Sequence, residues 1–193
     1  YASFFERVDS GNALKMAKIP FLLGWQGSWN AYKMLSQTIA NPLETRYWSV
    51  VPYQLGEGQA RQAVKYSVRA CSAGNSVIPD DPSSNYLRAA MVETLEAGTA
   101  CMQFMIQPRT ADMDVEDSIS RWSEEDAPFQ PVATVTIHQQ NFDTPDQNSA
   151  CENESYNPWQ SLPAHKPLGT VSRIRRVVYE AIRDLRHEMN GVN

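Results

Sequence analysis

Residues 156–179 read YNPWQSLPAHKPLGTVSRIRRVVY, and they join a proline-bearing segment to the clearest helical pattern in the chain. From residue 170 to about residue 190, apolar residues recur at the spacing of a helix. Thr170 can cap the start of this predicted helix, and Asn190-Gly191 can close its end. The apolar stripe of the helix comprises Val171, Ile174, Val178, Ala181 or Ile182, Leu185 and Met189.

The segment before this helix, residues 141–169, is polar and contains several prolines, so we expect it to be irregular. An irregular segment of that length is unusual in a compact domain, and such segments usually wrap another part of the protein or carry function. We therefore expect 141–169 to be a wrapping loop.

Three segments further upstream alternate between apolar and polar residues, which is typical of half-buried strands. These segments are 63–70, 100–107 and 132–138, and residues 46–51 are also β-prone. A helix is expected between the strands from about residue 84 to 97, with Leu87, Met91 and Leu95 on its buried stripe, and a short helix over 114–122, with Val115, Ile119 and Trp122 inward. Strands without regular alternation with helices favour an antiparallel sheet in an α+β protein.

The first 45 residues are expected to form a helical lead-in to the strand region 46–140. Trp25, Trp29 and Tyr32 follow the spacing i, i+4, i+7, which places three large rings on one face of a helix.

Composition excludes some classes of protein. The 193 residues carry 17 Lys and Arg against 22 Asp and Glu, which gives a net charge of −5. This acidic balance argues against nucleic acid or an anionic membrane as the main partner. No apolar run approaches the roughly 20 residues of a transmembrane helix. We expect a globular, soluble protein.

The three cysteines, Cys71, Cys101 and Cys151, match no zinc-binding spacing, and their odd number makes a disulfide framework unexpected. We therefore expect a reduced compartment, either the cytoplasm or an organelle matrix. The triplet 153–155, Asn-Glu-Ser, is a glycosylation sequon, but such triplets also arise by chance.

Common catalytic motifs are absent from the sequence, including the nucleophile elbow, the phosphate-binding glycine loop and the zinc-protease motif. His138, His165 and His187 are far apart, and we interpret each as a surface or hydrogen-bonded residue. The acidic cluster 124–126 is most simply a solvated loop.

The C-terminal helix carries a row of cations around one tyrosine. Arg175, Tyr179 and Arg183 follow i, i+4, i+8, and Arg186 lies one turn further on. Residues four apart are neighbours on a helix, so guanidinium groups flank the phenol of Tyr179. One interpretation is an iron-ligating tyrosinate. The other is a neutral tyrosine on a basic helix face, with Arg176 and Glu180 forming an ordinary ion pair.

Energetics limit what an arginine alone can do to a phenol. A phenol has a pKa near 10, so holding it ionised at pH 7 costs about 4 kcal/mol. One charge-assisted hydrogen bond supplies about 1.5–3 kcal/mol. Arg175 alone would therefore leave Tyr179 protonated, whereas Arg175 together with a ferric ion would not.

Several stretches resemble the catalase-related haem proteins, the smaller and divergent relatives of haem catalases. The most specific stretch is 156–169 followed by 173–179. The other stretches, in register over most of the chain, are 47–56 (YWSVVPYQLG), 64–67 (VKYS), 104–107 (FMIQ), 115–117 (VED) with Trp122, and 131–133 (PVA).

This resemblance implies an antiparallel β-barrel with flanking helices and a long C-terminal helix, of which this chain is a single domain holding the barrel's second half. It also implies haem b, with Tyr179 as the axial ligand of the iron and Arg175 paired with it. Arg186 takes the place of a family arginine that contacts a haem propionate. Arg183 stands where catalases carry a histidine, and a cation there could still meet a propionate.

One departure from the family matters for activity. The family's distal His and Asn, which activate peroxide, lie in a first half that no stretch here matches, so we identify no catalytic residue. The chain starts with Tyr1 rather than Met, so we expect either that an upstream part is missing or that the chain is a catalytically degenerate relative. Without a distal acid–base group, peroxide cleavage should be poor.

Two functions remain open, with a third between them. The first is a haem oxidoreductase that consumes hydrogen peroxide or an organic hydroperoxide, completed by a second chain or by the missing segment. The second is a non-catalytic, catalase-derived structural or interaction subunit, because half a barrel leaves an open sheet edge that something must cover. The third is a haem carrier without turnover.

Overall fold

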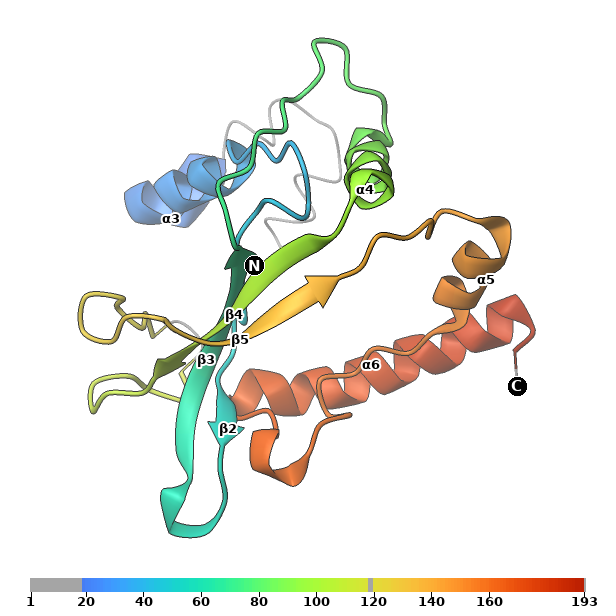
Figure 1. Ribbon diagram of the computed structural model, residues 1–193. Coiled ribbons are helices and arrows are strands. Elements are labelled where there is room, and N and C mark those ends of the chain that lie inside the picture. The colour runs from blue at the N-terminus through green and yellow to red at the C-terminus, as the bar shows by residue number, and fades with distance from the viewer. Residues whose placement is uncertain (1–18, 118–119, 193) are drawn as a thin grey trace. The chain divides into compact units, whose positions relative to one another are not determined.

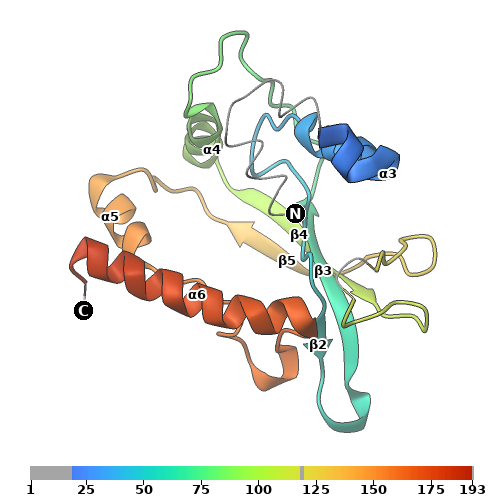
Figure 2. The same ribbon diagram turned by 180° about the vertical axis from the view of Figure 1, so that it is seen from behind.

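The computed structural model describes residues 19–117 and 120–192 and divides the chain into two compact units, Tyr1–Ile39 and Ala40–Asn193. Figures 1 and 2 show the elements from two sides. The helices expected in the first 18 residues lie outside the described residues. Of the first unit, the structure describes helix α3 (Ile19–Leu35), in which Gly24 has a φ of 64° and interrupts the helical backbone.

The three rings predicted on one face of α3 are largely exposed. Trp25 is 86%, Trp29 49% and Tyr32 62% accessible. The rings of Trp29 and Tyr32 stack with centroids 5.8 Å apart, and the ammonium group of Lys33 lies 5.5 Å from the centre of the Trp29 ring.

The second unit is built on a five-stranded antiparallel sheet, as the alternating segments predict. Its order is β1-β3-β4-β5, and β2 also pairs with β3. The strands are β1 (Tyr47–Trp48), β2 (Tyr53–Leu55), β3 (Gln62–Ala70), β4 (Ala100–Pro108) and β5 (Gln130–Ile137). β3 and β4 pair over seven residue pairs from Val64↔Pro108 to Ala70↔Met102. The sheet is open, so the expected barrel closure is absent from the described part of the chain.

Besides its strands, the described part of the second unit contains five helical elements: the one-turn helix η1 (Gly58–Ala60), α4 (Tyr86–Ala97), α5 (Pro145–Asn153), the one-turn helix η2 (Pro163–His165) and the C-terminal α6 (Gly169–Asn190). Figure 1 labels α4, α5 and α6. α4 and α6 confirm the helices predicted at 84–97 and 170–190. Segment 141–169, predicted to be irregular, includes α5 because the side chain of Thr144 accepts a hydrogen bond from the N–H of Gln147 and caps a helix that Pro145 begins.

One prediction for a shorter element holds only in part, and another was wrong. The β-prone segment 46–51 forms a strand only at β1, and it turns away before Val51. No helix forms over 114–117 or 120–122; instead the carboxylate of Asp114 accepts hydrogen bonds from the N–H groups of Glu116 and Asp117, so this side chain replaces the helical backbone ladder. Trp122 is nevertheless 6% exposed, as its predicted inward position requires.

The compact core lies under one face of the sheet. Met113, Trp122 and Ala127 form its buried cluster, with Val115 packed against it. Gln107 of β4 is 1% exposed and reaches into this loop, where its amide donates to the carbonyls of Trp122, Ser123 and Ala127 at 3.4, 3.1 and 2.9 Å. One buried amide thus organises a segment that has no regular structure.

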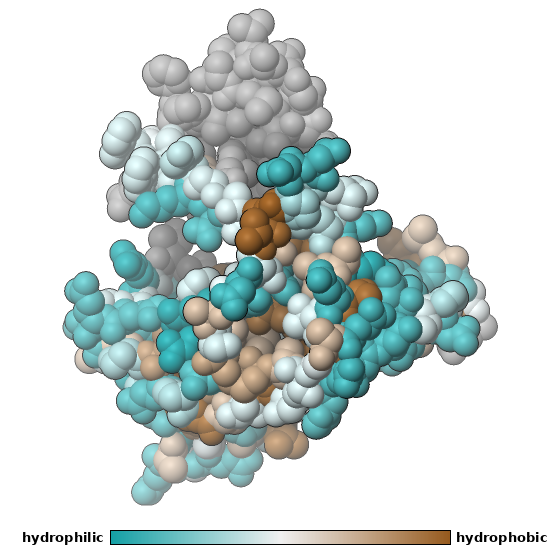
Figure 3. Space-filling view, turned by 45° about the horizontal axis from the view of Figure 1, so that its top comes forward, coloured by the Kyte–Doolittle hydropathy of each residue, from teal (hydrophilic) through white to brown (hydrophobic). Residues whose placement is uncertain are grey.

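The apolar surfaces of α6 and β5 are the least covered part of the unit. Ile174, Val178, Ile182, Leu185 and Met189 are between 44% and 78% exposed. Such a stripe normally packs on a core, but the main element contact of α6 is with α5. All but the last residue of β5 are exposed, although an alternating pattern predicted a half-buried strand. Figure 3 shows apolar surface lying open among the hydrophilic side chains.

Candidate functional site

The predicted tyrosine–arginine pair is present on α6. Nη2 of Arg175 donates a hydrogen bond to the hydroxyl oxygen of Tyr179, and the two atoms are 2.7 Å apart. The guanidinium carbon lies 5.1 Å from the centre of the Tyr179 ring. Both side chains are half-buried. The phenol oxygen therefore has one cationic donor fixed one turn before it, as the i, i+4 spacing predicts.

The start of α6 is fixed to the sheet through its leading segment. Leu168 N–H donates to the carbonyl of Pro52, and Gln54 N–H donates to the carbonyl of Lys166, both at 2.9 Å. Gly169 begins the helix with a φ of 83°, and a side chain there would collide with the carbonyl oxygen of Val115. Only glycine combines this φ with this close backbone approach. These contacts set where the third turn of α6 places Tyr179.

A second set of contacts holds the neighbouring face of α6. The indole N–H of Trp159 donates to the carbonyl of Ser172 at 2.8 Å, and the Arg176 guanidinium lies 5.3 Å from the Trp159 ring centre. Nε of Arg176 is also 3.5 Å from a carboxylate oxygen of Glu180. The ion pair expected in the alternative interpretation is therefore present, and it lies beside the Arg175–Tyr179 pair rather than replacing it.

The two downstream arginines are engaged in different ways. Nη2 of Arg183 lies 2.6 Å from a carboxylate oxygen of Asp184, so this cation has a neighbouring counter-charge. Arg186 donates through Nη2 to the carbonyl of Glu154. Its Nε is buried and has no hydrogen-bond partner among the described residues. Arg186 therefore retains a buried donor that an acceptor on a ligand could satisfy.

Tyr53 of β2 is a site residue that the helical spacing could not reveal. Its phenol lies within electrostatic range of both Arg175 and Tyr179. Burial raises the pKa of Tyr53; the positive charge of Arg175 lowers it by a smaller amount, and Tyr179 raises it further. The alternation of β2 explains the placement, because Tyr53 and Gln54 must point to opposite faces of the sheet.

Tyr53 begins a row of three aromatic rings in tilted contact across the sheet. The ring centres of Tyr53 and Tyr66 are 4.9 Å apart, and those of Tyr66 and Phe104 are 5.1 Å apart. Burial, together with Tyr53, raises the pKa of Tyr66. The three rings line an apolar hollow of about 510 Å³. The other lining residues are Leu55, Ile106, Val132, Ala133, Ser161 and His165.

A second hollow, of about 390 Å³, lies directly at Tyr179. Its other walls come from the segment before α6, namely Tyr156, Asn157, Pro158 and Gln160. The segment expected to be a wrapping loop thus contributes a wall beside Tyr179.

The histidines do not converge. His138 is exposed, His165 lines the apolar hollow, and Nε2 of His187 lies 2.9 Å from the carbonyl oxygen of Asn153. Within the described ranges, no group of three or more His, Cys, Asp or Glu side chains could hold a metal ion.

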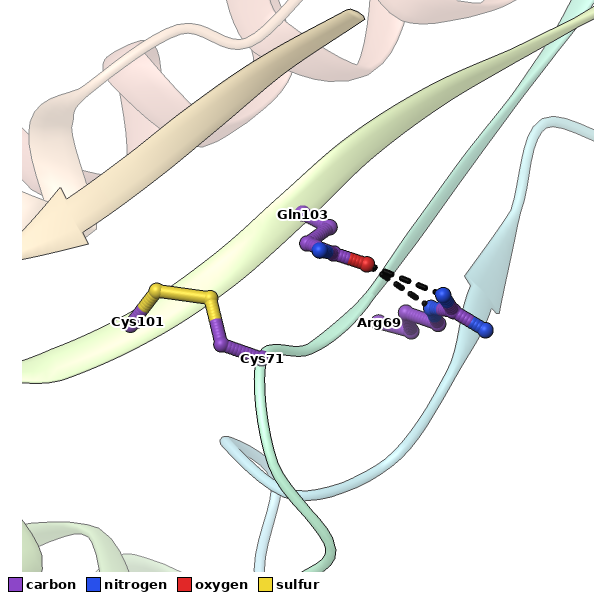
Figure 4. Close-up of a disulfide and its surroundings, with 4 residues drawn as sticks. All are labelled: Arg69, Cys71, Cys101 and Gln103. Atoms are coloured by element: carbon purple, nitrogen blue, oxygen red, sulfur yellow. Dashed lines mark hydrogen bonds between the residues drawn. A yellow bond between two sulfur atoms is a disulfide. The ribbon is translucent and has the colours of Figure 1, made fainter. Parts of the chain in front are cut away.

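The absence of a disulfide was a wrong prediction. Cys71 and Cys101 are bonded to each other and join the end of β3 to the start of β4 (Figure 4). The Cys71 N–H also donates to the Cys101 carbonyl at 3.0 Å, so the two residues continue the strand register. Disulfides are typical of oxidising compartments, so cysteine usage no longer supports a reduced compartment. Cys151 is a free, exposed thiol.

The side chain of Asn153, the sequon asparagine, connects α5 to α6. Its Nδ2 donates to the carbonyl of Ser149 at 3.1 Å, and its Oδ1 accepts a hydrogen bond from Asn190 at 3.0 Å. A glycan on this nitrogen would compete with those contacts.

No known family's sequence profile matches this chain, and no curated protein matches it by sequence. Solved structures do match. A fungal catalase superposes with a TM-score of 0.63 at 15% identity, over 77% of this chain and 32% of the catalase. A bacterial catalase superposes with a TM-score of 0.61 at 14% identity, over 90% of this chain and 34% of that protein.

These likenesses show a catalase-like fold. The chain spans about a third of the length of the catalases that it matches. The open five-stranded sheet and α6 are the parts of that fold described here. Among the described helices, none is long and apolar enough to cross a membrane.

Proposed function

We propose that this chain is a haem-binding, catalase-related protein in which Tyr179 is the axial ligand of the iron. The observation that carries the proposal is the 2.7 Å hydrogen bond from Arg175 to the Tyr179 hydroxyl, on a helix of a catalase-like fold. The alternative of an unrelated basic helix face does not account for both the pair and the fold.

The residues present fit a porphyrin in three respects. Tyr179 offers one oxygen ligand, and the Arg175 guanidinium donates a hydrogen bond to that oxygen. The neighbouring rings of Tyr53, Tyr66 and Phe104 offer an apolar wall suited to a hydrophobic group. Arg186 offers a buried, unpartnered N–H for a carboxylate. Arg183 is the weaker propionate anchor, because its guanidinium is already paired with Asp184.

Bound haem would supply an iron centre for peroxide chemistry. In this proposal the chain's own residues hold that centre: Tyr179 would bind it, Arg175 would keep its hydrogen bond to the phenol oxygen, and the rings of Tyr53, Tyr66 and Phe104 would provide an apolar wall. Moving a proton between the two oxygens of a peroxide requires a further acid–base group. We propose that a second chain or a preceding segment supplies that group and completes the sheet. The substrate would then be hydrogen peroxide or an organic hydroperoxide.

A second candidate, a non-catalytic interaction subunit, is favoured by one observation. The apolar stripe of α6 and nearly all of β5 are exposed, and an open sheet edge must be covered to remain soluble. In this proposal those surfaces pack against a companion protein, and haem is either absent or merely carried.

Titration with hemin, followed by absorption spectroscopy, tests the first proposal. The wild-type chain should develop a Soret band at one equivalent. Tyr179→Phe should lose or shift that band, whereas Tyr32→Phe, which alters a phenol 62% exposed in the other unit, should not. If Tyr179→Phe binds haem with an unchanged spectrum, the ligand is wrong. If the wild-type chain binds none, the interaction subunit is the better function, and co-purification of a second chain would support it.

A further inference from the structure

Three cations line one hollow on the face of β2 that points away from Tyr53. The hollow has a volume of about 450 Å³. Its cationic lining residues are Arg61, Arg109 and Lys166, and no Asp or Glu lines it. The chain as a whole is acidic, with a net charge of −5, so such a concentration of positive charge is not explained by composition.

Backbone hydrogen bonds bring the three cations together from separate segments. Lys166 lies in the segment before α6, where its carbonyl accepts from the N–H of Gln54 at 2.9 Å. Arg109 follows β4, and its N–H donates to the carbonyl of Ala63 at 3.0 Å. Arg61 directly precedes β3, and its backbone N–H donates to the carbonyl oxygen of Gly58 at 3.4 Å. The backbone positions of the three cationic residues are therefore set by the sheet and its flanking segments.

The charges of these side chains are not neutralised nearby. Within the described part of the chain, Arg61 and Lys166 make no side-chain hydrogen bond or ion pair, and Arg109 donates through Nε only to the Met113 carbonyl, at 2.6 Å. By contrast, five other arginines of this unit each lie within 3.5 Å of a carboxylate: Arg46, Arg88, Arg173, Arg176 and Arg183.

Asp114 is an acidic group within electrostatic range of one of these cations, Arg109. Asp114 has a pKa below its usual value, chiefly because the N–H groups of Glu116 and Asp117 donate to its carboxylate, and only to a lesser extent because of Arg109. The carboxylate of Asp114 is therefore mainly occupied by its own loop.

The wall between the cations is polar and buried. Gln54 is 5% exposed, and its Nε2 donates to the carbonyls of Gly56 and Pro163 at 2.9 and 3.1 Å. Its Oε1 is buried without a hydrogen-bond partner among the described groups. A ligand that accepts hydrogen bonds from the cations and also carries a hydroxyl would suit this set of groups.

We propose that this hollow binds a phosphate group, either inorganic phosphate or the phosphate of a small monoester. Guanidinium and ammonium groups form their strongest hydrogen bonds with oxyanions of this kind. A bound phosphate would also connect Lys166, just ahead of α6, to the ends of β3 and β4. The site does not depend on haem, because Gln54 and Tyr53 lie on opposite faces of β2.

Calorimetric titration of the full chain at constant ionic strength tests the proposal. Inorganic phosphate and glycerol 3-phosphate are the two probes, and tighter binding of one identifies the source of the phosphate. Arg61→Gln and Lys166→Gln should each weaken binding about tenfold or more, the loss expected for one charge-assisted hydrogen bond. Arg61→Lys should retain most of the affinity because the charge remains.

The control is Arg69→Gln, which removes an exposed arginine that hydrogen-bonds Gln103 outside the hollow (Figure 4). It should bind the probes as the wild type does. The proposal is overturned if neither probe binds beyond what chloride produces at the same ionic strength, or if the control weakens binding as much as Arg61→Gln. Circular dichroism of each variant separates lost binding from lost folding.

Discussion

Glu116, in the loop after β4, accepts two hydrogen bonds from the guanidinium of Arg173 on the first turn of α6. Nη1 and Nη2 of Arg173 lie 3.1 and 2.7 Å from the two carboxylate oxygens. The hydroxyl of Thr170 donates to the same carboxylate at 2.7 Å. The Arg173 hydrogen bonds, followed by that of Thr170, hold the pKa of Glu116 at about 2. This pair ties the start of the tyrosine-bearing helix to the sheet.

This pair predicts an acid-dependent loss of stability. Because the folded-state pKa of Glu116, about 2, lies below its usual 4.5, its contribution is complete above pH 4.5 and disappears as pH falls toward 2. Melting temperatures across that range should fall more steeply for the wild type than for Glu116→Gln. Both side chains are more than half exposed, so the difference should be small and reduced by salt.

Glu125→Gln is the control for this experiment, because the Glu125 side chain has no partner among residues 19–117 and 120–192. Its melting curve should keep the wild-type dependence on pH. If Glu116→Gln also keeps that dependence, the pair does not stabilise the fold.

Gly169 predicts a second stability effect at the same junction. Alanine there would have to adopt a φ of 83° and would overlap the carbonyl oxygen of Val115. We expect Gly169→Ala to lower the free energy of unfolding by about 1–3 kcal/mol. Gly98→Ala should cost little, because Gly98 has an extended φ of 173° and open space around it. Urea denaturation of both variants would check this, and equal losses would contradict it.

The sequence correctly predicted the elements that depend only on the spacing of apolar and polar residues within one segment. The three alternating segments, α4 and α6 follow from residue spacing alone, and so does the contact between Arg175 and Tyr179 four positions apart. Spacing along one helix fixes which of its side chains are neighbours.

The sequence could not predict what depends on strand register. Cys71 and Cys101 are 30 residues apart, and only the pairing of β3 with β4 brings them together. Tyr53 reaches the site from a three-residue strand that no periodicity marks. The spacing correctly predicted the apolar stripe of α6. It does not tell whether that stripe packs on the rest of this unit or on another molecule.

The disulfide predicts a large and specific contribution to stability. In the chain-entropy account, a bridge across a 30-residue separation reduces the conformational entropy of the unfolded chain. This raises the free energy of unfolding by about 3–4 kcal/mol. Replacing both Cys71 and Cys101 by serine should reduce the free energy of unfolding by roughly that amount, and a reducing agent should do the same to the wild type. Cys151→Ser should have no effect, because that thiol is exposed and free. A wild type indifferent to reduction would show that the bridge does not form in solution.

The difference in burial between α4 and α6 predicts different losses of stability when a leucine on each helix is replaced by alanine. Leu95 of α4 is 3% exposed, so Leu95→Ala should cost about 2–5 kcal/mol of unfolding free energy. Leu185 of α6 is 57% exposed, so Leu185→Ala should change the stability of the isolated chain by about 0.5 kcal/mol or less. If α6 packs on haem or on a companion protein, the same substitution should weaken that binding. Denaturation and binding titrations measure the two effects separately. A large loss of stability from Leu185→Ala in the isolated chain would mean that α6 already packs on a core in solution.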